Sequence, residues 1–202
     1  MSDINHIMVD LETLGTVPGC SILSIGAVRF VPEEDRLAEE FYAVILRTSC
    51  LDVFLEEKDE TIKWWNDKSP EARQVLLDAE DPDIAEPLPM ALESFNNWLL
   101  GLGGMRSIRI YGNGADFDNP ILRVAQDAAG IDPFNSKAGH FGGRCYRTLK
   151  SLDELFGPSF AAPKVEREGT YHNALDDAKH QARHLMAIVR HVRGLTKVPG
   201  DI

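Results

Sequence analysis

The sequence predicts an α/β fold in which helices flank a central sheet. Residues 1–46 hold three apolar runs of strand length, separated by short polar or Gly-rich links. Residues 59–100 and the stretch from residue 174 onward carry apolar side chains at the three- and four-residue spacing of helices. A fourth apolar run, residues 108–111, is followed by a Gly-rich loop and a helix start, which is the order of an α/β unit.

Composition favours one domain over residues 1–202, because a chain of 202 residues with 44% hydrophobic and 26% charged content can bury a sizeable core. No signal segment and no apolar run of roughly 20 residues is present, so we expect a soluble, cytoplasmic protein without a membrane partner. Cys20, Cys50 and Cys145 lack zinc-like spacing and are expected to be reduced. The net charge of -11 argues against non-specific adhesion to phosphate backbones.

The first strand, residues 6–13, carries two carboxylates that packing does not require. Side chains two apart on a strand point to the same side, so Asp10 and Glu12 project together. Two like charges in a partly buried site need a cation, and Mg²⁺ or Mn²⁺ prefers such oxygen ligands. The alternative is a strand end whose carboxylates reach solvent.

Two further strands are expected at residues 21–30 and 41–46. The first is too apolar for an exposed ribbon and suits the middle of a sheet. The acidic link at residues 32–35 has the length of a hairpin loop. Together with the first strand, these runs predict an antiparallel three-stranded meander.

The helical region begins near residue 59. Ser69 as N-cap and Pro70 at the first helical position predict a helix start, and apolar spacing predicts another helix over residues 90–100. Trp64 and Trp65 could stack on nucleobases, although aromatic residues at helical spacing more often belong to a core.

The fourth strand, residues 108–111, leads to a helix predicted to begin at Pro120 with Asn119 as its cap. Asp118 then lies beyond the carboxyl end of the strand, where open α/β sheets bind ligands. It could equally be a helix-start carboxylate that the helix dipole favours, and spacing does not exclude Asp116.

Basic residues are densest at Arg144, Arg147 and Lys150, on a short strand or helix entry, with Lys164 and Arg167 further on. They could contact a phosphate backbone or form a solvated strip. A brief helix is expected over residues 151–156, and residues 157–169 are loop-like.

The final helix is the clearest in the chain, with Asn173 as its N-cap and Asp176 as the capping-box partner. Asp177 has no such structural role. His172 lies on the preceding loop, and a histidine beside an acidic metal site is a candidate general base for activating water. We therefore expect residues 158–171 to be mobile without metal, with His172 swung away from the carboxylates.

Three motifs in order, Asp10-x-Glu12, Asn113-x-x-x-Phe117-Asp118 and His172 with Asp177, resemble those of the DEDDh 3′-5′ exonucleases of the ribonuclease H-like superfamily. That group includes ribonuclease T, oligoribonuclease and polymerase proofreading subunits. The wider context, residues 10–16 with 25–28 and Trp64-Trp65, is most similar to its phage-type and mycobacterial exonuclease branch. The resemblance covers residues 6–193.

The resemblance implies a ribonuclease H-like fold, with a central mixed five-stranded sheet flanked by helices, and metal-dependent 3′-5′ exonucleolysis of single-stranded nucleic acid. It implies two divalent ions, Mg²⁺ or Mn²⁺. Asp10 would bridge them, Glu12 and Asp177 would hold the nucleophile-side ion, Asp118 would hold the other, and His172 would deprotonate water. The substrate contacts it suggests are Thr13, Leu14, Gly15, Asn113, Phe117 and Arg147, with Leu14 as a wedge against the terminal base.

Two other classes stay open at this point: a non-catalytic nucleic-acid-binding module and an endonuclease or integrase of the same fold. The sequence does not distinguish DNA from RNA, because recognition of a 2′-hydroxyl depends on the shape of a pocket. The resemblance implies a nucleic acid with a free 3′ end as the partner, and a homodimer stays open.

Overall fold

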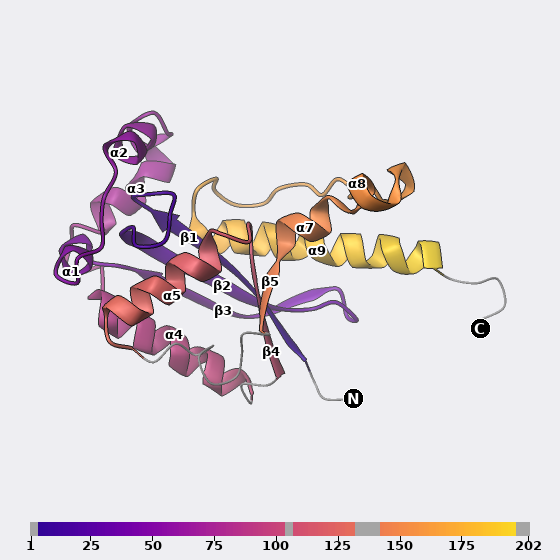
Figure 1. Ribbon diagram of the computed structural model, residues 1–202, viewed down its shortest axis with the longest axis horizontal. Coiled ribbons are helices and arrows are strands. Elements are labelled where there is room, and N and C mark those ends of the chain that lie inside the picture. The colour runs from indigo at the N-terminus through magenta and orange to yellow at the C-terminus, as the bar shows by residue number, and fades with distance from the viewer. Residues whose placement is uncertain (1–3, 104–106, 132–141, 197–202) are drawn as a thin grey trace.

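The structure, a computed structural model, describes residues 4–103, 107–131 and 142–196. Across these ranges no helix is both long enough and apolar enough to cross a bilayer. The centre of the fold is a mixed sheet with strand order β3-β2-β1-β4-β5 (Figure 1). Its strands are β1 (Asn5–Thr13), β2 (Ile22–Val31), β3 (Arg36–Val44), β4 (Ile108–Gly112) and β5 (Gly143–Cys145).

Strand directions divide the sheet in two. β1, β2 and β3 are antiparallel neighbours, as the predicted meander requires, whereas β4 and β5 continue the sheet parallel to β1. The parallel strands β1 and β4 therefore end at the same edge, which is where ligands bind in open α/β sheets.

Helices cover both faces of the sheet (Figure 1). Helix α9 crosses one face, α4 and α5 lie on the other, and α1, α2 and α3 gather at one end. The helices are α1 (Arg47–Leu51), α2 (Asp59–Asn66), α3 (Pro70–Asp78), α4 (Leu88–Leu102), α5 (Asp118–Ala128), α7 (Tyr146–Lys150), α8 (Leu152–Phe156), the 3₁₀ turn η2 (Pro158–Phe160) and α9 (Ala174–Thr196).

The alternation of side chains along β1 separates the core into two layers. Ile7, Val9 and Leu11 pack with α4 and α5 in one cluster. Met8 points to the other face and packs against α9. Asp10 and Glu12 have the parity of Met8, so both lie on the α9 side of the sheet.

The predicted fold is confirmed, two local predictions need correction, and one helix was not predicted. β3 begins at Arg36, earlier than expected, because its polar first half pairs with β2 as a half-exposed edge strand. Helix α5 begins at Asp118 instead of Pro120, and Asn119 is no cap: its amide donates to the Ile110 carbonyl at 3.2 Å. Helix α1 was not predicted, since five residues carry no clear period.

Candidate active site

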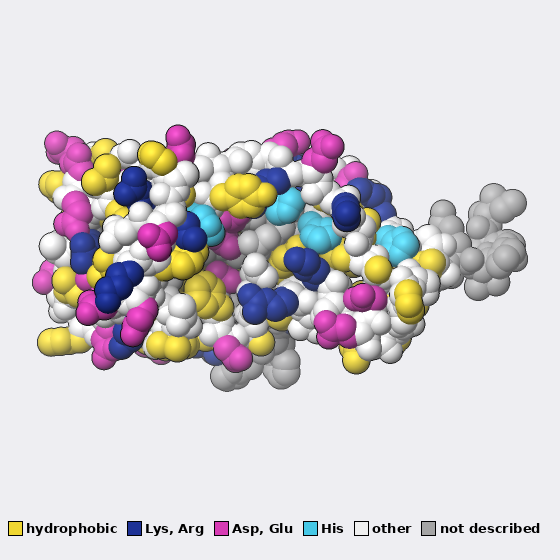
Figure 2. All heavy atoms as spheres, turned by 90° about the horizontal axis from the view of Figure 1, so that it is seen from above, with side chains coloured by type: hydrophobic (Ala, Val, Ile, Leu, Met, Phe, Trp, Pro, Cys, Tyr) yellow, Lys and Arg dark blue, Asp and Glu magenta, His cyan; other side chains and the backbone are white. Residues whose placement is uncertain are grey.

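Asp10 and Glu12 form the floor of a cavity of about 1140 Å³ between the end of β1 and α9. Figure 2 shows this hollow from above, with acidic atoms inside it and histidine and basic side chains along it. Glu12 is buried at 7% exposure. Asp10 accepts a hydrogen bond of 2.7 Å from Gln181 Nε2, which holds its carboxylate toward α9.

Asp118 reaches the same site from the first turn of α5, just beyond the end of β4. It is only 1% exposed, and its two oxygens accept backbone hydrogen bonds from Leu11 N at 3.2 Å and Asn113 N at 2.6 Å. Gly112 makes room for it, because a Cβ there would lie 2.9 Å from the Asp118 Cβ. Asp116, the alternative that spacing left open, is exposed.

Asp177 is placed by the start of α9. Asn173 caps the helix as predicted, since its Oδ1 accepts from Asp176 N at 3.1 Å. Gly26, which pairs with Asp10 across β1 and β2, lets this end of the helix lie directly on the sheet. A Cβ at Gly26 would lie 2.1 Å from the Ala174 carbonyl carbon, so a side chain there would push Asp177 away from Asp10.

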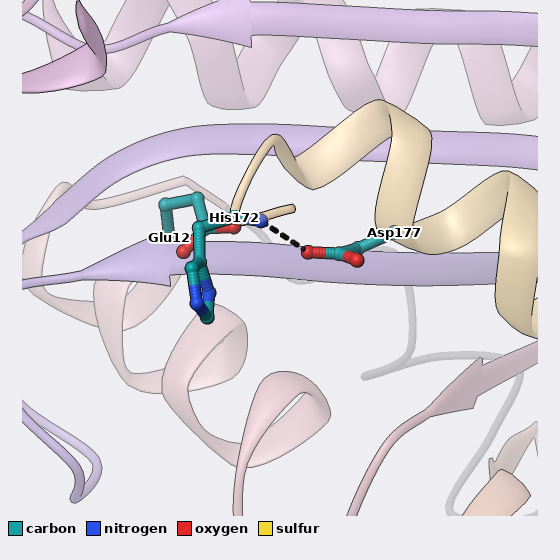
Figure 3. A group of neighbouring side chains, drawn as sticks. All are labelled: Glu12, His172 and Asp177. Atoms are coloured by element: carbon teal, nitrogen blue, oxygen red, sulfur yellow. Dashed lines mark hydrogen bonds between the residues drawn. The ribbon is translucent and has the colours of Figure 1, made fainter. Parts of the chain in front are cut away.

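His172 is held in place, which corrects the expectation that nothing fixes it. Its backbone N donates to Asp177 Oδ2 at 3.0 Å, and its φ of 61° is a left-handed conformation that few residues with a side chain adopt (Figure 3). Its ring meets Trp64 and Trp65 edge-on, at centroid distances of 4.9 and 6.0 Å. Trp65 is itself anchored by a hydrogen bond from Nε1 to the Thr13 carbonyl.

Burial and mutual repulsion raise the pKa values of the clustered carboxyl groups. Burial, followed by the charges of Asp118 and Glu12, raises the pKa of Asp10 well above its ordinary value. Burial and the charge of Asp177 raise the pKa of Glu12 to about 8. Burial raises the pKa of Asp118 to about 6, although its two backbone donors oppose the shift.

These residues fit a divalent cation. Glu12, His172 and Asp177 each offer a ligand atom within 4.8 Å of the other two (Figure 3). Carboxylate oxygens are preferred ligands of Mg²⁺ and Mn²⁺, and a bound cation would offset the repulsion that raises the carboxyl pKa values. Asp10 and Asp118 lie close enough to interact electrostatically with this group.

Most predicted substrate contacts lie along the cavity. Thr13, Gly15, Asn113 and Phe117 line it. Leu14 does not: its side chain is completely buried in a cluster with Leu23, Trp65 and other apolar residues of β2, β3 and α3. The complete burial of Leu14 gives no support to the predicted wedge, because a side chain inside this cluster does not face the cavity.

The basic residues divide into two groups. Lys150, Lys164 and Arg167 line the cavity. Arg147 instead supports its rim, because Nη2 donates to the Asn113 carbonyl at 2.8 Å and its charge lowers the pKa of Asp118 against the effect of burial.

The two tryptophans also separate. Both line the cavity, but Trp65 is a core residue at 1% exposure, whereas Trp64 is 41% exposed. The ammonium of Lys68 lies 3.9 Å from the centre of the Trp64 ring. The core interpretation is thus correct for Trp65 alone.

Sequence reasoning missed Gln181, His180 and His184, which face the cavity from α9. The signal was available for the first: Gln181 follows Asp177 by four residues, so it lies on the same helix face one turn further on.

Comparison with solved structures shows the same fold. The chain superposes on cell-death related nuclease 4 (CRN-4) with a TM-score of 0.62 and 15% identity, over 92% of this chain and 64% of that one. On the nuclease domain of 3′hExo, a DEDDh family member bound to rAMP, it superposes with a TM-score of 0.61 and 15% identity, over 94% of this chain and 93% of that one. On E. coli exonuclease I in complex with a dT13 oligonucleotide it superposes with a TM-score of 0.60 and 13% identity, over 95% of this chain and 42% of that one. The chain thus spans less than two thirds of the first and third proteins.

A search of curated proteins found no match. Residues 5–189, nearly the whole chain, match the family described as the 3′-5′ exoribonuclease Rv2179c-like domain. The predicted 3′-5′ exonuclease class is confirmed, and the chain belongs to the Rv2179c-like 3′-5′ exoribonuclease family.

Proposed function

We propose that the chain removes nucleotides from the 3′ end of single-stranded RNA, using two divalent ions, Mg²⁺ or Mn²⁺, held by Asp10, Glu12, Asp118 and Asp177. One observation carries this proposal: segments far apart in the sequence place Asp10, Glu12 and Asp177 on one cavity beside His172. Asp118 lies close enough behind them for its charge to raise the pKa of Asp10. Two such ions would stabilise both the attacking and the leaving oxygen of a phosphodiester displacement.

The chain's own groups would orient the acids and move the proton. Gln181 fixes one oxygen of Asp10, and two backbone amides fix Asp118, so neither carboxylate has to reorganise. Burial lowers the pKa of His172, so its ring is largely neutral at pH 7 and a ring nitrogen can accept a proton from water. Trp64 and Trp65 pack against that ring and restrict its rotation.

The terminal nucleotide is proposed to lie against Trp64, whose exposed ring forms part of the cavity wall near His172. Stacking on an aromatic face tolerates any base, which suits an enzyme that shortens a strand regardless of its sequence. RNA is the proposed substrate because the family is described as exoribonucleases. The likeness to nucleases bound to rAMP and to a dT13 oligonucleotide supports a nucleic-acid strand but does not choose between the sugars.

The test is a product analysis with matched RNA and DNA oligomers carrying a 5′ label. With Mg²⁺ or Mn²⁺ we expect a ladder that shortens from the 3′ end of the RNA, more slowly for DNA, and no cleavage in chelator. A circular single strand should survive. Cleavage of the circle would favour an endonuclease, and binding without cleavage would favour a non-catalytic module.

A cytoplasmic location is also proposed, since Cys20, Cys50 and Cys145 are unpaired, as in a reducing compartment. A homodimer stays a prediction, to be checked by light scattering on the purified chain.

A further inference from the structure

The cavity extends well beyond the carboxylates. Its volume of about 1140 Å³ exceeds the roughly 300–1,000 Å³ of typical small-ligand sites. The extension follows one face of α9 and is roofed in part by residues 161–165. We call this extension the far arm; it is lined by Tyr146, Lys150, Lys164, His180 and His184.

Helix periodicity sets the direction of the far arm. Asp177, His180, Gln181 and His184 are three, four and seven residues apart, so they lie on one face of α9 and all line the cavity. The seven residues from Asp177 to His184 span about 10 Å along the helix axis. That length corresponds to roughly three stacked nucleotides at about 3.4 Å each.

Polar atoms in the far arm lack partners. His180 Nδ1 and His184 Nε2 are enclosed but form no hydrogen bond with any residue that the structure describes. The other ring nitrogen of His184 lies 2.6 Å from the Tyr146 hydroxyl, which fixes the ring. The Pro163 carbonyl raises the pKa of His184 against the effect of burial, without a hydrogen bond of normal geometry. Enclosed polar atoms without a protein partner are costly, so these two nitrogens are available to hydrogen-bond a group that enters the far arm.

The far arm also carries uncompensated positive charge. Within the described residues Lys150 and Lys164 form no ion pair, whereas Lys58, at the opposite end of the cavity, pairs with Glu56. Lys150 lies close enough to both imidazoles for its charge to lower their pKa values. Asp153 lines the same arm and offsets only part of this charge.

A metal ion does not suit the far arm. Over the described ranges, the set of three metal-type ligands within reach of one another is Glu12, His172 and Asp177, which includes neither His180 nor His184. Two ammonium groups would repel a cation from the two imidazoles. An anion with several oxygen acceptors fits, since lysines supply charge and neutral imidazoles supply N–H donors.

We propose that the far arm is a subsite for the phosphodiester backbone of the RNA strand on the 5′ side of the scissile bond. This inference rests on the proposed function. The end of the cavity near Trp64 suits one terminal nucleotide, and the longer far arm suits the strand that continues away from it. The enzyme would then hold several linked nucleotides during each cleavage.

The first test compares substrates of two lengths. An RNA pentamer reaches the far arm and a dinucleotide does not, so wild-type kcat/KM should favour the pentamer by about tenfold or more. In the double variant Lys150→Gln, Lys164→Gln this ratio should fall about tenfold. Lys179→Gln is the matched control, because Lys179 lies on α9 but pairs with Glu40 at 2.8 Å outside the cavity. An unchanged ratio in the double variant would overturn the proposal.

The second test needs no cleavage. A pentamer with one uncharged methylphosphonate link, placed in turn at each upstream position, is titrated onto the protein in calcium buffer. At one upstream position the methylphosphonate should weaken binding to the wild-type protein about tenfold. The same link should leave the affinity of the double variant unaltered, because the phosphate and the lysines are then partners in one contact. Independent, additive losses would refute the subsite. If the wild-type protein cleaves neither oligomer with Mg²⁺ or Mn²⁺, the proposed function fails, and this binding assay still decides on the subsite.

Discussion

Arg167 forms an ion pair with Asp177, from the segment that precedes α9, and so places a guanidinium among the clustered carboxylates. The same Nη2 donates to the Thr170 carbonyl at 3.0 Å, and the guanidinium lies over the Tyr171 ring at 3.9 Å. Its charge lowers the pKa of Glu12 against the effects of burial and repulsion. A cation of the protein itself thus partly compensates the site.

We predict from this pair that Arg167 and a metal ion compete for Asp177. Arg167→Gln should bind Mn²⁺ roughly tenfold more tightly than the wild type in a calorimetric titration, because a charge-assisted bond no longer has to be broken. Arg183→Gln is the control, since Arg183 ties the same segment through Glu168 at 2.9 Å without touching the carboxylates. Weaker binding by Arg167→Gln would show that the arginine supports the metal site.

Asp10→Asn should abolish cleavage and stabilise the metal-free protein. The amide keeps the size of the side chain and removes one of several repelling charges, which we expect to raise the free energy of unfolding at pH 8 by roughly 1 kcal/mol or more. For a chain of this size, 1 kcal/mol is about 2–4 °C in Tm. Thermal melts in chelator and an RNA cleavage assay check the two halves. A variant that melts lower, or that still cleaves, contradicts the assignment.

The stability of the metal-free protein should fall as pH rises from about 5 to 8. The folded pKa of Glu12 is about 8 against an ordinary 4.5, and that of Asp118 is about 6 against 3.8, so the folded state binds protons more tightly than the unfolded state. Their contribution is complete below the ordinary values and is lost as pH passes the raised ones. Melts across this range in chelator should show the loss, and Glu12→Gln should flatten it. Adding Mn²⁺ at pH 8 should restore Tm.

His172→Asn should lose roughly 10²- to 10⁴-fold in turnover, the usual contribution of a general base. Asparagine tolerates the left-handed backbone at this position, so the fold should persist. Because burial lowers the pKa of His172, the acidic limb of the wild-type rate should lie below the ordinary value of 6.5 and should vanish in the variant. His191→Asn, at a half-buried histidine that contacts the Ser159 carbonyl, is the control. If the acidic limb of the pH-rate profile survives in His172→Asn, the general base is another group.

Gly26→Ala should destabilise the protein by about 3 kcal/mol or more, because the added methyl group would overlap the backbone of Ala174. Displacing the start of α9 also moves Asp177, so Mn²⁺ affinity should fall with stability. Gly101→Ala, in a helix position where a Cβ meets nothing within 4 Å, should instead stabilise by about 0.5–1 kcal/mol. Equal Tm values for the two variants would show that α9 does not need to lie this close to Gly26.

The strand and helix periods explain what the sequence could predict. Period two along β1 correctly put Asp10 and Glu12 on one side, and the cap at Asn173 correctly started the last helix. These features depend on neighbours in the chain. The fold class and the three-stranded meander followed from the same local patterns, and the five-stranded mixed sheet followed from the motif resemblance.

Contacts over long separations were beyond that reasoning. The choice of Asp118 over Asp116 depends on amides of two other segments, and the fixed ring of His172 depends on tryptophans more than a hundred residues away. The burial of Leu14 was not predicted because a Gly-flanked position looks like a loop, yet tertiary packing buries it. The ion pair between Arg167 and Asp177 could not be predicted from neighbouring residues either, because ion pairs need no fixed spacing in the sequence.

The hydrogen bond between Asp10 and Gln181 joins positions 171 residues apart, in the first strand and the last helix. A chain still emerging from the ribosome without α9 therefore lacks Gln181 and Asp177 together, and the remaining acids have nothing to close the cavity against. A chain that lacks α9 thus lacks both one wall of the cavity and one of the four clustered carboxylates.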